Sequence, residues 1–381
     1  MEIIRKLNLA ALLEKKSFFL FGPRSTGKTT LIRQQLQGKS KMINLLDRET
    51  YLRFSAHPGE LEAVVKADPK GALVVIDEIQ KIPMLLDEVH RLIESEKQRF
   101  LLTGSSARKL KRGQANLLAG RAWLAELFPL TWSEIPKFEL NKYLLYGGLP
   151  HVYLSAEPAE ELRAYAGTYL YEEIQAEGIV RKIPAFSRFL EAAAVSNGQL
   201  LNFTEVANDC QVSPSTVREY YSILEDTLMG FLLQPWLRSK KRKAIQTAKF
   251  YFFDMGVVHS LTQTKSLDRH SDLYGRAFEH FIGMELRAYL SYRRCDEKLT
   301  FWRSVNDQEV DYLVGDHTAI EVKSSQQVSP KHLRGLEALA EEGIFKNFFL
   351  VTQDKLALKK GKVTCLYWED FLQKILGDEL F

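Results

Sequence analysis

The chain has 381 residues, of which 45% are hydrophobic and 26% are charged, and its formal net charge at pH 7 is +4. This length is too great for one compact core and predicts two or three domains, while the composition excludes a chain that is mainly disordered. The net charge is too small to indicate nucleic-acid binding by the surface as a whole.

No run of apolar residues approaches the ~18 that a membrane span needs, so we expect a cytoplasmic protein that does not contact a membrane. The cysteines are isolated from one another, which predicts neither a disulfide framework nor a zinc site and favours buried thiols. Two basic clusters, at residues 108–112 and 238–243, either lie on the solvated surface or contact nucleic acid.

Residues 22–30 read GPRSTGKTT and lie between a predicted strand at 17–21 and a predicted helix at 31–36. This is the G-x-x-x-x-G-K-[ST] pattern in its strand, loop and helix context, where glycines let backbone N–H groups point at phosphates. Lys28 would reach the β- and γ-phosphates of ATP, and Thr29 would ligate Mg²⁺ at the helix N-terminus. The predicted ATP-binding residues are therefore Gly22, Pro23, Arg24, Ser25, Thr26, Gly27, Lys28, Thr29 and Thr30.

A strand predicted at 72–76 is apolar throughout, as strands buried on both faces are, and it ends in Asp77 and Glu78. Carboxylates at this strand end would face the phosphate loop. We expect Asp77 to hold the Mg²⁺ shell and Glu78 to act as the general base on the attacking water.

Two more strands are predicted at 41–46 and 99–103. The first stands between the two nucleotide motifs and fits the additional-strand class of P-loop ATPases. The second ends in TGSS, where Ser105 could sense the γ-phosphate, although TGSS is also common in ordinary strand-to-loop turns. Arg121 precedes a strand at 122–128, and it either neutralises charge on the phosphoryl group, in cis or across a subunit interface, or forms a structural salt bridge.

Five segments read GPRSTGKTT, VVIDEIQKIP, LLTGSSARKL, LLAGRAWLAELFPLTWSE and YGGLP. Together they resemble the predicted bacterial and archaeal AAA+ family ATPases, and the resemblance spans essentially the whole chain. It implies an α/β fold with a parallel P-loop NTPase sheet of the AAA+ or additional-strand type. It also implies a C-terminal domain related to PD-(D/E)XK nucleases, that is, a restriction-endonuclease-like α/β domain whose function is uncharacterised.

Three helices are predicted in the middle of the chain: one at 186–196, a short one capped by Thr204, and one that Ser213 and Pro214 open. Such an order suggests a helix-turn-helix. Strands at 231–236 and 249–253 would flank the basic cluster and make it a winged variant, which either contacts nucleic acid or only joins domains. In a DNA reader the groove would be contacted by Ser215, Thr216, Arg218 and Glu219.

Residues 309–323 predict a β-hairpin with its turn near Asp316. A turn centred there places Asp311 opposite Glu321 on one face, with Lys323 two residues further along. Opposed carboxylates repel and so require a cation between them, for which Mg²⁺ or Mn²⁺ is the natural occupant. Lys323 would then position a water molecule or stabilise the pentavalent phosphate.

This D-x(9)-E-x-K spacing is similar to the PD-(D/E)XK nuclease core, although Val310 stands where that core usually has proline. The resemblance also implies a glutamate on a preceding helix, which is Glu279, with Glu285 as a substitute. Three interpretations are open: an active metal-dependent phosphodiesterase, the same fold kept for binding, or a solvated acidic hairpin without a site.

The predicted domains are an ATPase domain at 1–135, a helical connector or lid at 136–185, a winged-helix-like domain at 186–255 and a nuclease-like domain at 256–381. We expect Mg²⁺-dependent ATP hydrolysis coupled to nucleic-acid binding or processing, with DNA preferred to RNA, or an ATP-regulated switch or scaffold whose tail binds without cleaving. Homo-oligomerisation is open. The predicted catalytic residues are Lys28, Glu78, Ser105, Arg121, Glu279, Asp311, Glu321 and Lys323, and the predicted metal ligands are Thr29, Asp77, Glu279, Asp311 and Glu321.

Overall fold

The structure is a computed structural model that describes residues 3–67, 73–104, 118, 120–169 and 183–380. The chain forms two compact units. The first comprises Met1–Pro136, Leu149–His151 and Ser222–Met229, and the second comprises Lys137–Gly148, Val152–Tyr221 and Gly230–Phe381.

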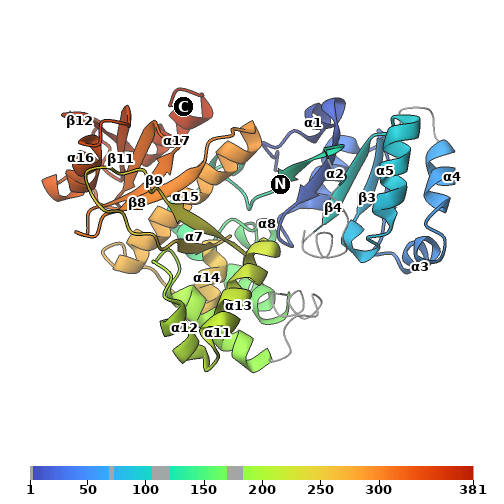
Figure 1. The fold of residues 1–381 in the computed structure, drawn as a ribbon, viewed down its shortest axis with the longest axis horizontal. Coiled ribbons are helices and arrows are strands. Elements are labelled where there is room, and N and C mark those ends of the chain that lie inside the picture. The colour runs from blue at the N-terminus through green and yellow to red at the C-terminus, as the bar shows by residue number, and fades with distance from the viewer. Residues whose placement is uncertain (1–2, 68–72, 105–117, 119, 170–182, 381) are drawn as a thin grey trace. The chain divides into compact units, whose positions relative to one another are not determined.

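The described strands of the first unit form one five-stranded sheet in the order β2-β3-β4-β1-β5, with every neighbouring pair parallel (Figure 1). The predicted strand at 41–46 corresponds to β2, which lies at the edge beside β3. In the sheet, β4 lies between β1, which leads into the phosphate loop, and β3, which ends in Asp77. The 41–46 strand stands between these two motifs along the chain, but the prediction that it also stands between them in the sheet is wrong. Parallel strands are joined by crossovers, and chain order therefore does not give their order in the sheet. The strands are β1 (Ser17–Phe21), β2 (Ser40–Asn44), β3 (Leu73–Asp77), β4 (Phe100–Gly104) and β5 (Ala122–Glu126).

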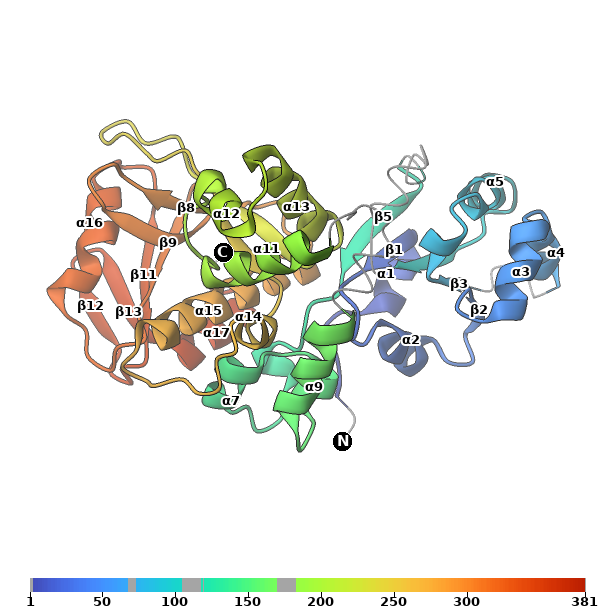
Figure 2. The same cartoon turned by 90° about the horizontal axis from the view of Figure 1, so that it is seen from below.

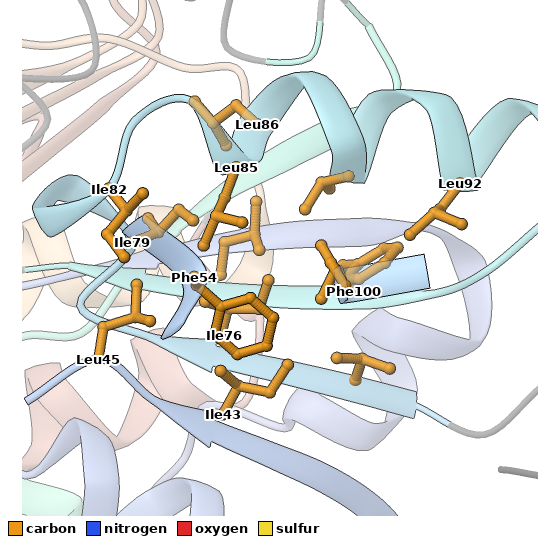
Figure 3. Packing of buried hydrophobic residues seen from close by; sticks show 14 of the residues in the cluster. Ile43, Leu45, Phe54, Ile76, Ile79, Ile82, Leu85, Leu86, Leu92 and Phe100 are labelled. Carbon is orange, nitrogen blue, oxygen red and sulfur yellow. The ribbon is translucent and has the colours of Figure 1, made fainter. Parts of the chain in front are cut away.

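Helix α5 (Leu85–Glu96) carries its buried side chains at helical spacing, so one face of it packs onto the sheet. Figure 3 shows Leu85 and Leu92 pointing toward the side chains of Ile76 and Phe100 on β3 and β4. This packing fixes the strand whose end carries the predicted acidic pair. Other helices described in this unit are α1 (Leu9–Lys15), α2 (Lys28–Leu36), α3 (Arg48–Ala56) and α4 (Glu60–Lys66).

The described strands of the second unit form one eight-stranded sheet in the order β12-β13-β11-β10-β9-β8-β6-β7. Strands β6 and β7 pair antiparallel, and β6 also pairs parallel with β8. One sheet therefore runs through both the predicted winged-helix segment and the predicted nuclease-like segment. The strands are β6 (Gly230–Pro235), β7 (Lys249–Phe252), β8 (Leu299–Arg303), β9 (Glu309–Val314), β10 (Thr318–Val322), β11 (Asn347–Thr352), β12 (Leu358–Lys360) and β13 (Val363–Tyr367).

Helices α11 and α12 lie side by side (Figure 2), and α13 begins at Pro214 as the sequence predicts. Ser213 caps α13, because its hydroxyl accepts a hydrogen bond from the backbone N–H of Thr216 at 3.2 Å. The predicted cap at Thr204 is wrong, since Asn202 caps α12 by accepting from the N–H of Glu205 at 3.2 Å. The helices described after residue 137 are α7 (Leu140–Tyr146), α8 (Pro150–Tyr153), α9 (Pro158–Ala164), α11 (Ile183–Val195), α12 (Phe203–Cys210), α13 (Pro214–Asp226), α14 (Met255–Leu261), α15 (Asp272–Arg293), α16 (Arg334–Ala340) and α17 (Trp368–Leu376).

Asp254 explains the glycines of the YGGLP segment. Its buried carboxylate accepts hydrogen bonds from the N–H of Gly148 at 2.7 Å and from the N–H of Val257, at the start of α14, at 3.3 Å. A Cβ atom on Gly147 would lie 1.9 Å from Asp254 Oδ1, and Gly147 has a φ of +74°. The segment therefore needs glycine for a close approach and for its backbone conformation.

We expect Gly147→Ala to lower the free energy of unfolding of the second unit by about 2–3 kcal/mol, because it combines a steric clash with a φ that L-residues rarely adopt. Urea unfolding followed by circular dichroism measures this. Gly167→Ala is the matched control, since a Cβ there meets open space. Equal stability of the two variants would contradict the packing role of Gly147.

Candidate functional site

The loop between β1 and α2 forms a tight backbone cradle. Ser25 and Gly27 have φ values of 64° and 93°, and Gly27 is the N-cap of α2. A Cβ on Gly22 would lie 2.6 Å from the carbonyl oxygen of Leu127. The loop conformation therefore requires glycine at both predicted positions.

Lys28 lies inside this cradle. Its ammonium group donates to the carbonyl oxygens of Gly22 at 2.6 Å and Pro23 at 3.1 Å, and the residue is only 7% exposed. The hydroxyl of Thr26 donates to the same Pro23 carbonyl at 2.8 Å. A positive charge is thus held within the loop, where it would meet the phosphates of a nucleotide.

Asp77 links the ends of two strands to the first turn of α2. The hydroxyl of Thr29 donates to Asp77 Oδ2 at 3.3 Å, and the hydroxyl of Thr103 on β4 donates to Asp77 Oδ1. The backbone N–H of Glu78 donates to the Thr103 hydroxyl at 3.2 Å. The structure therefore brings together Thr29, Asp77 and Glu78 as predicted, and it adds Thr103.

Sequence reasoning missed Thr103 and selected Ser105, which lies outside the described residues. The signal was present in the TGSS run, but it could not be assigned to Thr103 without knowing that β4 lies beside β3. Thr103 is fully buried, so its hydroxyl serves the acidic pair and not solvent.

Thr103→Val should slow ATP hydrolysis by about tenfold or more, since it leaves a buried Asp77 oxygen and the Glu78 N–H without their partner at almost unchanged volume. Phosphate release at saturating ATP measures the effect. Thr103→Ser keeps the hydroxyl and should retain most of the activity. A loss shared equally by both variants would assign Thr103 a packing role only.

Glu78 has an unusual backbone. Its φ of 62° and ψ of 46° put a residue with a side chain in the left-handed region. Its carboxylate accepts a hydrogen bond from the amide of Gln80, a buried residue in the following turn. Such strain costs about 1–3 kcal/mol and persists where surrounding contacts enforce it, most often at functional sites.

Arg121 lies at the wrong edge of the sheet for a role in cis. Strand β5 is parallel to β1, with Ala122 beside Ser17, so Arg121 precedes the amino ends of these strands while the cradle follows their carboxyl ends. Five residues of strand, about 15 Å, separate the two edges. The guanidinium group pairs with Glu94 on α5. The in-cis role is therefore excluded within this unit, and the predicted salt bridge is present.

Arg5 holds the cradle from behind, and nothing in the sequence pointed to it. Its guanidinium group donates to the carbonyl oxygens of Thr26 at 2.7 Å and Phe128 at 2.6 Å. Its Nε lies 3.0 Å from Glu134 Oε2, and both side chains are buried. Arg5 belongs to no recognisable sequence motif, so its contact with the phosphate loop is evident only from the structure.

The predicted C-terminal hairpin has the expected register. Val314, Leu313 and Tyr312 pair with Thr318, Ala319 and Ile320, and the continued register places Asp311 opposite Glu321. Lys323 Nζ lies 2.6 Å from Glu321 Oε1 and 3.5 Å from Asp311 Oδ2. The three predicted residues of the hairpin therefore lie together.

Glu279, on α15, is held by two residues of β7. The hydroxyl of Tyr251 donates to Glu279 Oε1 at 2.6 Å, and Lys249 Nζ lies 3.4 Å from the same oxygen and 2.7 Å from Glu309 Oε1. Burial alone would lower the pKa of Lys249, but Glu279 and Glu309 together raise it above its usual value. The sequence did not indicate Lys249 or Tyr251, because β7 lies 30 residues before Glu279 in the chain.

Burial and the neighbouring Asp311 raise the pKa of Glu321 to about 8, and burial raises the pKa of Asp311 as well. Glu321 Oε2 is buried without a hydrogen-bond partner in the described part of the chain. A buried, unsatisfied carboxylate oxygen beside a second carboxylate fits a divalent cation, which takes oxygen ligands. Among the described residues, no group of three or more His, Cys, Asp or Glu side chains is placed to hold a metal ion.

The basic run at 238–243 is partly engaged within the second unit. Arg238 pairs with Asp316, and Arg242 pairs with Glu341 at 2.9 Å. These arginines are therefore less available to phosphates than the predicted wing requires, whereas the lysines of the run stay exposed. On α13, Ser215, Arg218 and Glu219 are exposed and Thr216 is half-buried. The other basic cluster, 108–112, lies outside the described residues.

Family models match three successive parts of the chain. An AAA domain matches residues 14–136, and two domains of unknown function, DUF8612 and DUF4143, match residues 137–268 and 274–371. The first part of the chain is therefore similar to an AAA domain. Within the described residues no helix is both long enough and apolar enough to cross a membrane.

The uncharacterized protein Rv2008c of Mycobacterium tuberculosis is 32% identical over 312 residues, which cover 77% of this chain and 66% of that protein. The uncharacterized protein MJ1544 of Methanocaldococcus jannaschii is 25% identical over 337 residues, which cover 80% of this chain and 73% of that protein. The chain thus spans slightly less than two thirds of the mycobacterial relative.

Two solved structures show weaker likenesses. The replication initiator DnaA bound to AMPPCP and single-stranded DNA is 15% identical with a TM-score of 0.29, covering 59% of this chain and 90% of that chain. A DNA polymerase III gamma-subunit-related protein of Thermotoga maritima is 12% identical with a TM-score of 0.25, covering 57% and 96%. TM-scores this low carry no structural argument.

Proposed function

We propose that the AAA-type domain binds ATP with Mg²⁺ and hydrolyses it. The observation that carries this proposal is the convergence of Thr29, Asp77, Thr103 and Glu78 beside a cradle that contains Lys28. Thr29 and Asp77 are the oxygen ligands that would hold Mg²⁺, which when bound neutralises charge on the β- and γ-phosphates.

The protein's own groups divide the remaining work. The cradle N–H groups and Lys28 bind the phosphates and fix their orientation. The carboxylate of Glu78 accepts the proton of the attacking water. The amide of Gln80 holds this carboxylate, and Thr103, which also contacts Asp77, holds the backbone N–H of Glu78. Arg5 keeps the loop in place through the Thr26 carbonyl.

Phosphate release from ATP by the purified chain tests this function. We expect turnover with Mg²⁺. We expect this turnover to be lost when EDTA removes the metal, because no cation then neutralises the charge on the phosphates. Turnover that continues in EDTA, or no turnover with Mg²⁺ at any ATP concentration, would contradict the proposal.

We also propose that the second unit cleaves a nucleic-acid strand with Mg²⁺ or Mn²⁺, and that ATP hydrolysis is coupled to this processing. The convergence of Asp311, Glu321 and Lys323, with the unsatisfied Glu321 oxygen, supports it. Asp311 and Glu321 would hold the cation, which would activate water. Lys323 would stabilise the phosphate in the transition state.

The helical segment before β6 supports nucleic-acid binding. Three helices, α11 to α13, are followed by the antiparallel pair β6 and β7, and Leu200 forms an isolated bridge with Lys249 of β7. This order of elements is that expected for a winged helix-turn-helix. We propose DNA as the preferred partner of this segment.

A panel of single- and double-stranded DNA and RNA, incubated with Mg²⁺, Mn²⁺ or EDTA, tests the second activity. We expect metal-dependent nicking of at least one substrate, with DNA cut more readily than RNA. If no substrate is cut with either metal while ATP changes the affinity for it, the chain is the ATP-regulated scaffold of the alternative interpretation. If neither occurs, both interpretations of the second unit are wrong.

A further inference from the structure

A cavity of about 900 Å³ lies beside the C-terminal carboxylates. Its wall is formed by the first turns of α15, the residues that follow β10, and the residue after β11. Glu279 and Lys323 both line it. The cavity therefore opens directly onto the groups of the proposed cleavage site.

The cavity carries an excess of positive charge. Arg269 and Arg276 line it, both are exposed, and neither forms an ion pair with any residue that the structure describes. At the other end of α15, in contrast, Arg293 pairs with Asp378 at 2.9 Å. Two guanidinium groups thus face a cavity without an acidic partner, in fork geometry suited to phosphate oxygens.

Two acidic residues also line the cavity and offset part of this charge. Asp272 stands at the start of α15, and the carboxylate of Glu279 is already compensated by Lys249. The imidazoles of His270 and His332 line the wall as well, and burial and then Lys323 lower the pKa of His332, which favours its neutral form. Lys323 is itself paired with Glu321 at 2.6 Å. The two arginines, Arg269 and Arg276, therefore supply the positive charge that the remaining lining acid, Asp272, does not cancel.

Neutral polar side chains complete the lining. They are Ser324, Ser325, whose hydroxyl donates to the carbonyl oxygen of Gln327 at 2.7 Å, and Gln353, whose amide donates to the hydroxyl of Tyr274 at 3.0 Å. The volume is near the upper end of the roughly 300–1,000 Å³ typical of ligand pockets, so it exceeds what a single phosphate fills. A ligand with several anionic oxygens spaced along its length matches this wall best.

We propose that the cavity binds the sugar-phosphate backbone of a nucleic-acid strand, with Arg269 and Arg276 contacting the phosphates that flank the one beside Lys323. This assignment rests on the proposed nucleic-acid binding of the second unit, but it does not require cleavage. The arginines supply affinity without sequence preference, since phosphate contacts carry no base information.

Fluorescence anisotropy of a short labelled single-stranded DNA, titrated with the full chain in EDTA, tests the assignment apart from cleavage. Arg269→Gln and Arg276→Gln should each weaken binding about fivefold to tenfold at low salt. Each should also reduce the slope of log K against log salt by about 0.7, the value for one lost phosphate contact on a single strand. Arg334→Gln removes an equally exposed arginine of α16 outside the cavity and should leave both quantities unchanged.

The outcomes separate this inference from the proposed function. Weaker binding and a smaller slope in both cavity variants support the inference whether or not the wild type cuts DNA. Unchanged binding in both variants overturns the inference while nucleic-acid binding by the chain stands. A wild type that binds no DNA at low salt overturns the inference and the proposed DNA partnership together, and leaves the ATPase proposal unaffected.

Discussion

Glu78→Gln should reduce the rate of ATP hydrolysis by about 10²–10⁴-fold while leaving ATP affinity close to that of the unaltered chain. The amide has nearly the shape of the carboxylate and can still accept the hydrogen bond from Gln80. It cannot accept a proton from water at neutral pH. The change therefore removes an interaction that matters only in the transition state, so kcat falls and binding persists.

Phosphate release at saturating ATP and equilibrium binding of a labelled nucleotide measure the two quantities separately. Glu14→Gln, an exposed change on α1, is the matched control and should alter neither. A Glu78→Gln protein with normal turnover would remove the general base from the account. A Glu78→Gln protein that neither binds nor hydrolyses ATP would show that Glu78 also maintains the structure of the binding site.

The second large effect concerns the C-terminal hairpin. Asp311→Asn should reduce metal-dependent nucleic-acid cleavage by about 10²–10³-fold and leave ATP hydrolysis unchanged. Asparagine can keep the hydrogen bond that Asp311 Oδ2 accepts from the N–H of Val322 at 2.8 Å, so the hairpin should stay folded. What it loses is the negative charge that a divalent cation needs.

Lys323→Gln should have an effect of similar size through a different step, because its ammonium group would stabilise the charged phosphate and not bind the metal. Cleavage of the best substrate of the panel, with ATPase activity followed in the same samples, measures both variants. Asp307→Asn, at a highly exposed carboxylate of the same unit, is the control. Cleavage that survives both Asp311→Asn and Lys323→Gln would refute the site.

Local patterns were predictable where the chemistry lies within a few residues. Strand β1 has the bounds that its apolar run predicts, and the cradle follows it with glycines where the backbone approaches closely. The turn of the C-terminal hairpin is likewise centred on Asp316, which gives Asp311 and Glu321 their shared register. In each case the residues that interact are near neighbours in the chain or are joined by one turn.

Contacts between distant segments were predictable only where a motif marks both partners, as for Thr29 and Asp77. Thr103 reaches Asp77 only because β4 inserts beside β3, and the order of parallel strands is set by crossovers that leave no mark in spacing. Lys249 and Arg5 support the two sites from 30 and 21 residues away, as single basic residues without a motif. For Arg121 the sequence left a catalytic role and a salt bridge open, and the choice between them depends on which edge of the sheet the residue occupies.

ATP binding and turnover by Lys28→Ala test the central claim most directly, since the cradle has meaning only if its buried ammonium group meets the phosphates. We expect nucleotide binding to fall sharply and hydrolysis to disappear, whereas Lys39→Ala, at an exposed lysine after α2, should behave as the unaltered chain. A Lys28→Ala protein that binds and splits ATP as readily as the unaltered chain would contradict the account.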